Sequence, residues 1–366
     1  MRFDIYCTVI DNYGDIGVCW RLARQLVAEY GSEYGCEVHL WVNDDGWQAA
    51  RQLIGELPQV PAPTHAEGVT VSAWSLAHDA EDCTGDVLIE GFGCTLPGAA
   101  LAQLAARTHK PVWINLEYFS AEDWVPNFHL QSGFDWERGA TRWFFFPGVH
   151  AHSGGILRER ELIAQRDPAQ TQTPNSNQFW VLCFAYAHAP YAEWLDALAI
   201  KQDTPIVIDL CGQQTQLAVA QLNPAAYPNV TVRNVPFVSQ PKFDALLRQA
   251  DVLWVRGEDS LARALWSGRP FVWHIYPQAE NAHHAKLLAW LAHYAQPFPA
   301  LLREALVDVY LAWNGVTNAA LLGEAWRRLM RQWDDWQQYS WLRRNQFAQA
   351  PDLAQRLMAF VKAQSF

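Results

Sequence analysis

The clearest indication of the fold lies near the start of the chain, which reads FDIYCTVI at residues 3–10, DNYGDIG at 11–17, GVCWRLARQLVAEY at 17–30 and EVHLWV at 37–42. The first and last of these runs are short, continuous and apolar, as is typical of strands buried on both faces. Between them, Val18, Leu22 and Leu26 recur at the spacing of one helix face. A strand, a helix and a second strand in this order predict a parallel sheet covered by helices.

The same alternation continues along the chain. Further strands are expected at residues 86–90, 111–116 and 143–147, separated by alanine-rich helices. Residues 166–178 are polar, contain proline and show no periodicity, so they predict a linker. The alternation then resumes, with strands expected at 179–186, 205–210, 230–235, 251–255 and 270–274.

These patterns predict an α/β protein with two doubly wound, Rossmann-like domains. The first domain is expected at residues 1–170 and the second at 178–344. Pro351 interrupts the terminal helices, so residues 345–366 are expected to form a helix that packs back on the first domain. Two such domains joined by a linker form a cleft, and open α/β sheets bind ligands at the carboxyl ends of their strands.

Composition excludes several classes of protein. Half of the 366 residues are hydrophobic and only 18% are charged, so wholesale disorder is excluded. The formal net charge of −11 argues against a general binder of nucleic acid or of anionic membranes. No apolar run reaches the length of a membrane span.

The nineteen tryptophans suit a core, a partner surface or a stacking platform. Packing is expected for Trp20, Trp254, Trp266 and Trp273.

The seven cysteines include no Cys-x-x-Cys pair, and the N-terminus has the pattern of a strand rather than of a signal peptide. Reduced, mostly buried thiols are the simplest interpretation. The sequence therefore favours a cytoplasmic protein.

Several ligand-binding motifs are absent or incomplete. The sequence has no phosphate-binding loop of the Gly-x-x-x-x-Gly-Lys-Ser/Thr type. Gly91 and Gly93 follow a predicted strand, but Leu96 stands where a dinucleotide-binding fingerprint has its third glycine, so a tight turn is the preferred interpretation. The histidine pairs near residues 150 and 283 lack a third ligand at suitable spacing. We expect no metal ion.

Two carboxylates, Asp11 and Asp15, flank Asn12, Tyr13 and Gly14 in the loop after the first predicted strand. This is the position where α/β folds place their chemistry. Two structural alternatives remain open at this point: Asp15 could cap the following helix, and Asp11 could end the strand in an Asx turn.

The stretch Arg256-Gly-Glu258-Asp259-Ser260 leads from a predicted strand into a predicted helix. A helix N-terminus offers free N–H groups and a partial positive charge to a diphosphate, and an arginine adds a full charge. The acidic side chains and the serine are also what any helix start prefers. Acidic groups repel phosphate, so a functional role for Glu258 and Asp259 requires them to face hydroxyls or amides.

Aromatic residues gather near the ends of other predicted strands. In the second half they could stack a nucleobase, with Gln240 reading its edge, or belong to an ordinary core. In the first half, Trp113 and Trp124 are expected in the core, whereas Asn115 and Glu117 are expected on a rim that faces a partner. The second-half group consists of Phe184, Tyr186, Phe237 and Phe243.

Four motifs closely resemble the elongation factor P arginine rhamnosyltransferases of bacteria, the EarP family. They are DNYGDIGVCWRLARQL at 11–26, NLEY at 115–118, FFFPG at 144–148 and RGEDS at 256–260. The resemblance implies the two-domain glycosyltransferase B fold and transfer of L-rhamnose from dTDP-β-L-rhamnose to one arginine of elongation factor P. It also implies inversion at the anomeric carbon without a metal or other cofactor. The modified factor helps ribosomes through polyproline stretches.

The resemblance also implies roles for individual residues. Asp15 matches the proposed general base, Asp11 matches the aspartate that holds the acceptor arginine, and Glu258 matches a glutamate on which activity depends. Ile275 departs from the pattern, since an aromatic residue is expected there in some relatives. Contacts to the donor diphosphate and sugar are implied for Arg256, Asp259, Ser260 and Tyr186, and contacts to thymidine for Phe184, Phe237, Gln240 and Phe243.

The chemistry of arginine fits this assignment. A guanidinium is a poor nucleophile because it stays protonated and delocalised. Carboxylates can localise its charge and accept a proton as the C–N bond forms. Two alternatives differ in chemistry: a relative of the same fold acting on a small molecule, including a sugar-nucleotide epimerase, and a non-catalytic sensor of nucleotide sugars. The sensor alone would keep its function after Asp15→Asn.

Overall fold

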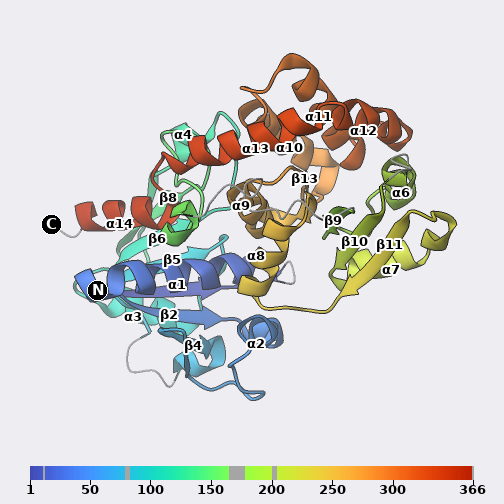
Figure 1. Ribbon diagram of the computed structural model, residues 1–366. Helices are drawn as coiled ribbons and strands as arrows, with labels where there is room; N and C mark the ends of the chain where they lie inside the picture. The colour runs from blue at the N-terminus through green and yellow to red at the C-terminus, as the bar shows by residue number, and fades with distance from the viewer. Residues whose placement is uncertain (11–12, 79–82, 165–177, 200–203, 365–366) are drawn as a thin grey trace. The chain divides into compact units, whose positions relative to one another are not determined.

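The computed structural model describes residues 1–10, 13–78, 83–164, 178–199 and 204–364. The chain forms two compact units, one of Met1–Leu162 with Ala350–Phe366 and one of Ile163–Gln349 (Figure 1). The expected boundary at residue 170 and all of the predicted linker except Gln178 lie outside the described residues. The expected boundary at residue 344 falls inside a helix, α13 (Trp333–Ala348), and the change of unit follows where that helix ends, just before Pro351.

The first unit contains an eight-stranded sheet of order β3-β4-β2-β1-β5-β6-β8-β7. Its central strands are parallel, and the edge strands β3 and β7 are antiparallel to their neighbours. Short, exposed edge strands such as β7 carry no continuous apolar run, which is why the sequence did not predict them. The strands are β1 (Arg2–Cys7), β2 (Glu37–Val42), β3 (Thr64–Ala66), β4 (Val69–Ala73), β5 (Val87–Gly91), β6 (Val112–Leu116), β7 (Ser132–Asp135) and β8 (Ala140–Phe145).

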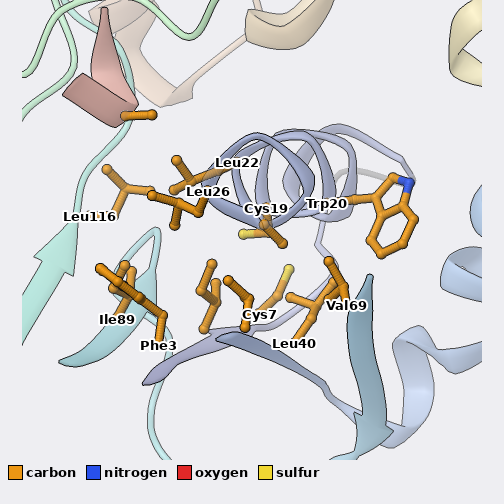
Figure 2. Close-up of a cluster of buried hydrophobic side chains, with 14 of the residues drawn as sticks. Phe3, Cys7, Cys19, Trp20, Leu22, Leu26, Leu40, Val69, Ile89 and Leu116 are labelled. Carbon is orange, nitrogen blue, oxygen red and sulfur yellow. The ribbon is translucent and has the colours of Figure 1, made fainter. Parts of the chain in front are cut away.

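One face of this sheet packs on the long helix α1 (Gly14–Tyr34). Phe3 and Cys7 on β1 alternate with residues of the opposite face, as side chains along a strand must, and they lie against Cys19, Leu22 and Leu26 of the helix (Figure 2). Helix α1 begins three residues before its predicted start at residue 17, because the loop residues Gly14 and Asp15 already form its first turn. The other helices of the unit are α2 (Trp47–Ile54), α3 (Gly98–Ala106), α4 (Val125–Phe128) and α14 (Leu353–Gln364), with 3₁₀ turns η1 (Asp44–Gly46), η2 (Trp74–His78) and η3 (Arg160–Ala164).

The C-terminal helix α14 belongs to this same core. Leu353, Leu357 and Val361 are buried in one cluster with the residues of α1 and β1. Phe360 packs edge-on against Trp143, with ring centroids 5.3 Å apart. The last helix thus completes the cover of the first sheet although more than 180 residues of the second unit separate it from the rest.

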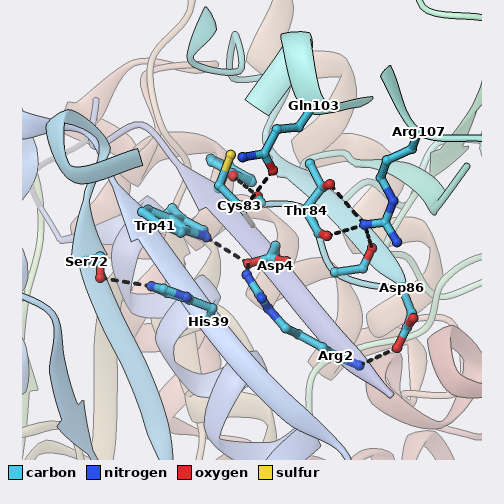
Figure 3. Close-up of polar contacts among 12 residues, drawn as sticks. Arg2, Asp4, His39, Trp41, Ser72, Cys83, Thr84, Asp86, Gln103 and Arg107 are labelled. Atoms are coloured by element: carbon cyan, nitrogen blue, oxygen red, sulfur yellow. Dashed lines mark hydrogen bonds and ion pairs between the residues drawn. The ribbon is translucent and has the colours of Figure 1, made fainter. Parts of the chain in front are cut away.

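A polar network lies on the opposite face of the sheet, near the amino ends of the strands (Figure 3). Asp4 is fully buried and accepts hydrogen bonds from Trp41 Nε1 at 2.8 Å and from Arg2 at 2.9 Å. The backbone N–H of Arg2 donates to Asp86 at 2.8 Å. These contacts join β1, β2 and the start of β5, so we assign them a structural role.

The second unit contains a five-stranded, wholly parallel sheet of order β11-β10-β9-β12-β13. The strand order reverses beside β9, as in doubly wound folds. The strands are β9 (Phe179–Cys183), β10 (Ile206–Cys211), β11 (Val230–Val235), β12 (Val252–Arg256) and β13 (Phe271–His274). The helices are α6 (Tyr191–Ala199), α7 (Gln213–Ala220), α8 (Gln240–Gln249), α9 (Gly257–Ser267), α10 (Ala282–Tyr294), α11 (Ala300–Trp313), α12 (Leu322–Met330) and α13, with 3₁₀ turns η4 (Pro224–Ala226), η5 (Ala279–Asn281) and η6 (Ala319–Leu321).

Tryptophans fill the core of the second unit. Trp254 on β12 contacts Trp194, Trp313 and Trp326, with ring centroids 4.5 to 5.8 Å apart. The packing role predicted for Trp20, Trp254, Trp266 and Trp273 is confirmed, since all four are buried.

Trp124 contradicts the prediction that it belongs to the core, because its side chain is 38% exposed. It precedes the single-turn helix α4, whose only buried residue is Val125. No helix in the described part of the chain combines the length and the apolar character needed to cross a membrane.

Candidate functional site

Asp15 lies in the first turn of α1, at the carboxyl edge of the first sheet. Its carboxylate is almost completely buried. Oδ2 accepts a hydrogen bond from the backbone N–H of Ile10 at 2.8 Å, and Oδ1 accepts one from the hydroxyl of Tyr118 at 3.2 Å. The N-cap of α1 is Tyr13, without a capping side chain, so Asp15 is not the cap. Asp11 and Asn12 lie outside the described residues.

The residues around Asp15 are held by their own contacts. The Tyr13 hydroxyl donates to Oε1 of Gln52 at 2.6 Å, which joins the start of α1 to α2. Gly14 is the first residue of the helix. The ring of Tyr118 stacks on Phe92, with centroids 4.6 Å apart and planes 19° apart, and Tyr118 remains 40% exposed. Asp15 therefore lies beside an exposed aromatic surface.

The expected tight turn after β5 is confirmed, and it explains the position of Asn115. Phe92 and Gly93 both have positive φ, and the N–H of Gly93 donates to Asn115 Oδ1 at 3.1 Å. The Asn115 amide in turn donates to Glu117 at 2.7 Å. Asn115 is buried, so its expected place on a partner-facing rim is wrong: the side chain holds the turn. Glu117 is half-buried, and this burial raises the pKa of its carboxyl despite the hydrogen bond from Asn115.

A further carboxylate, Glu90 at the carboxyl end of β5, was not among the candidate residues. It is buried beside Arg142 of β8, whose guanidinium lies 3.4 Å from Oε2 and 5.3 Å from the centroid of Trp113. Burial raises the pKa of Glu90 to about 7, and Arg142 opposes the rise. The carboxyl edge of the first sheet thus carries the acidic residues Asp15, Glu90 and Glu117.

Replacing Glu90 by Gln should make the protein more stable at alkaline pH. The folded state holds a proton on Glu90 that the unfolded chain releases near the ordinary pKa of 4.5. Stability therefore falls as the pH rises from about 4.5 to about 7, by up to about 3 kcal/mol for a shift of this size. Thermal unfolding should show similar stability for the variant and the wild type at about pH 5 and a more stable variant at about pH 8.

Glu137→Gln is the matched control, because Glu137 is 81% exposed. It should change stability little at either pH. Equal pH dependence of the Glu90 variant and the wild type would contradict a raised pKa for Glu90.

In the second unit, Arg256 ends β12 in contact with two aromatic rings. Its guanidinium carbon lies 4.6 Å from the centroid of Phe184 and 4.6 Å from that of Tyr186, and it hydrogen-bonds Gln214. These two cation–π contacts restrict the position of the guanidinium. Arg256, Phe184 and Tyr186, which were all predicted to contact the donor, thus lie together in the structure.

Helix α9 starts directly after Arg256, at Gly257 with φ of 71°. Its first backbone N–H groups have no acceptor within the helix and suit an anion. Glu258 is paired with Lys286 of α10 at 2.7 Å, and Asp259 lies 3.9 Å from Arg263. The pairing of both acidic side chains with cations removes much of the repulsion that they would exert on a phosphate.

The aromatic residues form a surface beside Arg256. Phe184 and Phe243 meet edge to face, with centroids 5.7 Å apart. A Cβ at Gly212 would lie 2.7 Å from the Phe184 ring, so only glycine leaves room for it at the end of β10. Gln240 begins α8 and is buried, whereas Phe237 is 46% exposed.

An aromatic side chain does occur beside Ile275. Ile275 itself is buried, and its N–H donates to Asn314 at 3.0 Å. Tyr276 follows it, is 46% exposed and meets the Tyr186 ring edge-on at 5.6 Å.

Two residues that contact the candidate site were not predicted. Gln214 of α7 bonds Arg256, and Lys286 of α10 pairs with Glu258. Nothing in the local sequence indicates that helices distant along the chain supply these partners.

Solved structures of low sequence identity share this architecture. MurG from Acinetobacter baumannii is 15% identical, with 99% of each chain covered and a TM-score of 0.56. The spinosyn rhamnosyltransferase SpnG, solved with thymidine diphosphate, is 12% identical over the whole of both chains, with a TM-score of 0.54. The two sheets with their covering helices therefore have the glycosyltransferase B fold, which consists of two Rossmann-like domains.

The particular family follows from nearer relatives. A structure of EarP, solved to explain EarP-mediated arginine glycosylation of translation elongation factor EF-P, is 30% identical, with 99% of each chain covered and a TM-score of 0.63. Protein-arginine rhamnosyltransferases from Pseudomonas putida and Pseudomonas aeruginosa are 39% and 37% identical, with 98% of each chain covered. Residues 3–362 match the family of elongation factor P rhamnosyltransferases, EarP, and the chain belongs to this family.

Proposed function

We propose that the protein transfers L-rhamnose from dTDP-β-L-rhamnose to an arginine of elongation factor P, with inversion at the anomeric carbon. Whole-chain similarity to protein-arginine rhamnosyltransferases supports the reaction class. The observation that carries the chemistry is Asp15, a buried carboxylate with both oxygens in hydrogen bonds, at the edge of the sheet where acceptors reach the fold.

In this proposal the second unit binds the donor. The surface of Phe184, Phe237 and Phe243 stacks the thymine, and Gln240 hydrogen-bonds its edge. The diphosphate lies at the start of α9, where backbone N–H groups, Ser260 and Arg256 bind its oxygens. Asp259 and Tyr186 contact the sugar.

The first unit binds the acceptor. Asp11 and Asp15 receive the guanidinium of the arginine, and Glu117 adds a third carboxylate near it. As the C–N bond forms, Asp15 accepts a proton from the attacking nitrogen and the C–O bond to the diphosphate breaks. Attack on the face opposite the leaving group inverts the anomeric carbon. Glu258 supports the donor side through its pair with Lys286.

The leaving diphosphate needs positive charge to offset its own. Arg256, in contact with two rings, and the N-terminus of α9 supply it without a metal ion. Both are in position before the reaction, so little reorganisation is needed as charge develops. The acceptor and the donor are cytoplasmic molecules in this proposal, and so is the enzyme.

The intact mass of elongation factor P, incubated with this protein and dTDP-rhamnose, tests the proposal. We expect a gain of one deoxyhexosyl group on the wild-type factor and none when the acceptor arginine is replaced by lysine. An unchanged mass of the wild-type factor would rule the proposal out. A peptide that carries the acceptor arginine should react far more slowly than the folded factor, since a single arginine offers few contacts for specificity.

A further inference from the structure

Two histidines of the second unit form a chain of hydrogen bonds with the backbone N–H of Tyr186. The N–H of Tyr186 donates to Nδ1 of His274 at 3.3 Å. Nε2 of His274 lies 3.1 Å from Nε2 of His188. His274 is buried at the end of β13, whereas His188 is exposed just after the end of β9. The chain of contacts therefore runs from a backbone amide in the interior to a side chain at the surface.

The backbone amide determines the protonation of both rings. An amide N–H can only donate, so Nδ1 of His274 must be the acceptor and its proton must lie on Nε2. That proton points at His188, so Nε2 of His188 must accept. A neutral His188 then carries its own proton on Nδ1. Its Nδ1 is thus a hydrogen-bond donor, and no described residue accepts a hydrogen bond from it.

Burial and, to a lesser extent, neighbouring charges favour the neutral form of both rings. Burial lowers the pKa of His274 well below its ordinary value, and His188, Arg256 and His283 lower it further. The partial burial of the His188 ring lowers its pKa as well. A second proton on His188 would lie on Nε2 and face the N–H at Nε2 of His274. His274 could avoid this clash only by moving its proton to Nδ1, which would break the hydrogen bond from Tyr186.

The neighbours of His188 indicate which ligand its ring contacts. Its ring is parallel to that of Tyr186, with centroids 6.0 Å apart and planes 13° apart. Tyr186 is the ring on which Arg256 stacks. His188 therefore lies on the side of the unit where the proposed donor binds.

We propose that His188 recognises the nucleotide sugar, donating a hydrogen bond from Nδ1–H to an acceptor oxygen, and that His274 fixes the tautomer that makes this possible. The oxygen belongs to the diphosphate or to the sugar, which present the same acceptor chemistry. This inference rests on the proposed function, because it takes the nucleotide sugar to be the ligand.

Nitrogen NMR of protein labelled with ¹⁵N-histidine tests the tautomers directly. His188 should carry its proton on Nδ1 and His274 on Nε2 near neutral pH, with the His188 signals identified by their loss in a His188→Asn variant. A proton on Nε2 of His188 would overturn the inference, whatever the ligand.

Binding of dTDP-rhamnose and of dTDP to His188 variants, measured by calorimetry, tests the recognition. The amide of His188→Asn can replace Nδ1–H, so its affinity should stay close to that of the wild type. His188→Gln places its amide at the position of Nε2, and His188→Phe has no donor, so both should bind about tenfold or more weakly. If these two variants bind both ligands more weakly, the acceptor oxygen belongs to the diphosphate. If they bind only dTDP-rhamnose more weakly, it belongs to the sugar.

Controls separate this inference from the proposed function and from loss of folding. Each variant is first shown to unfold at a temperature near that of the wild type. Equal affinity of the wild type, His188→Gln and His188→Phe for dTDP-rhamnose would overturn the role of His188 and leave the proposed function standing. Failure of the wild type to bind either ligand would instead contradict the proposed donor, and the inference with it.

Discussion

Replacing Asp15 by Asn should abolish nearly all transfer of rhamnose while leaving the binding of dTDP-rhamnose unchanged. General base catalysis contributes about 100- to 10,000-fold to a rate, and an amide cannot accept the proton. The asparagine fits the same space: its oxygen can accept from the N–H of Ile10, and its amide can donate to Tyr118, whose hydroxyl can turn to accept. The rate of rhamnosylation, followed by the mass of elongation factor P, measures the loss.

Two companion variants make the result specific. Asp45→Asn changes an exposed aspartate near the end of the neighbouring strand β2 and should leave the rate unchanged. Tyr118→Phe removes one hydrogen bond to Asp15 but keeps the carboxylate, so it should lower the rate much less. A wild-type rate for Asp15→Asn would exclude Asp15 as the base, and loss of donor binding would indicate a structural role.

Replacing Arg256 by Met should weaken binding of dTDP-rhamnose by about 10- to 100-fold, which corresponds to the loss of hydrogen bonds from a charged donor. The turnover number should fall as well, because the same charge stabilises the leaving diphosphate in the transition state. Methionine keeps an apolar chain between Phe184 and Tyr186, so the loss of packing is small. Calorimetry and the kinetics of transfer measure the two effects separately.

Arg256→Lys and Arg303→Met serve as references for this result. Lysine keeps the charge but cannot stack as a plane on the two rings or bond two oxygens at once, so its effect should be intermediate. Arg303 is exposed on α11, and its replacement should change neither affinity nor rate. Unchanged affinity of Arg256→Met for dTDP-rhamnose would show that Arg256 does not bind the diphosphate.

Local patterns predicted the architecture because a buried parallel strand must be a continuous apolar run and its covering helix must be apolar on one face. β2 and β11 begin and end at the predicted residues. The predicted strand at 3–10 ends early, at Cys7. Beyond Cys7 the backbone N–H groups of Val9 and Ile10 donate to the side chains of Asn43 and Asp15 instead of to a neighbouring strand. Runs of apolar residues thus locate strands better than they locate strand ends.

The candidate site was predictable residue by residue but not contact by contact. The position of Arg256 before a helix is visible in the sequence, whereas its stacking between Phe184 and Tyr186 brings together residues about 70 positions apart. The rim expected at Asn115 was wrong for the same reason: its partner, Gly93, is delivered by another strand.

The pattern of the sequence predicted the α/β class, the two sheets, and a set of polar and aromatic residues at strand ends that resembles one family. These features depend on spacing and composition, which are local. How these residues act on one another follows from the contacts of the folded chain: which ring contacts a guanidinium, which hydroxyl bonds Asp15, and which nitrogen of His188 carries a proton. Hydrogen bonds and desolvation depend on neighbours a few ångströms away in space, and chain separation does not encode that distance. The tautomer of His188 is the clearest case, because an amide 2 residues before it acts through a ring 86 residues after it.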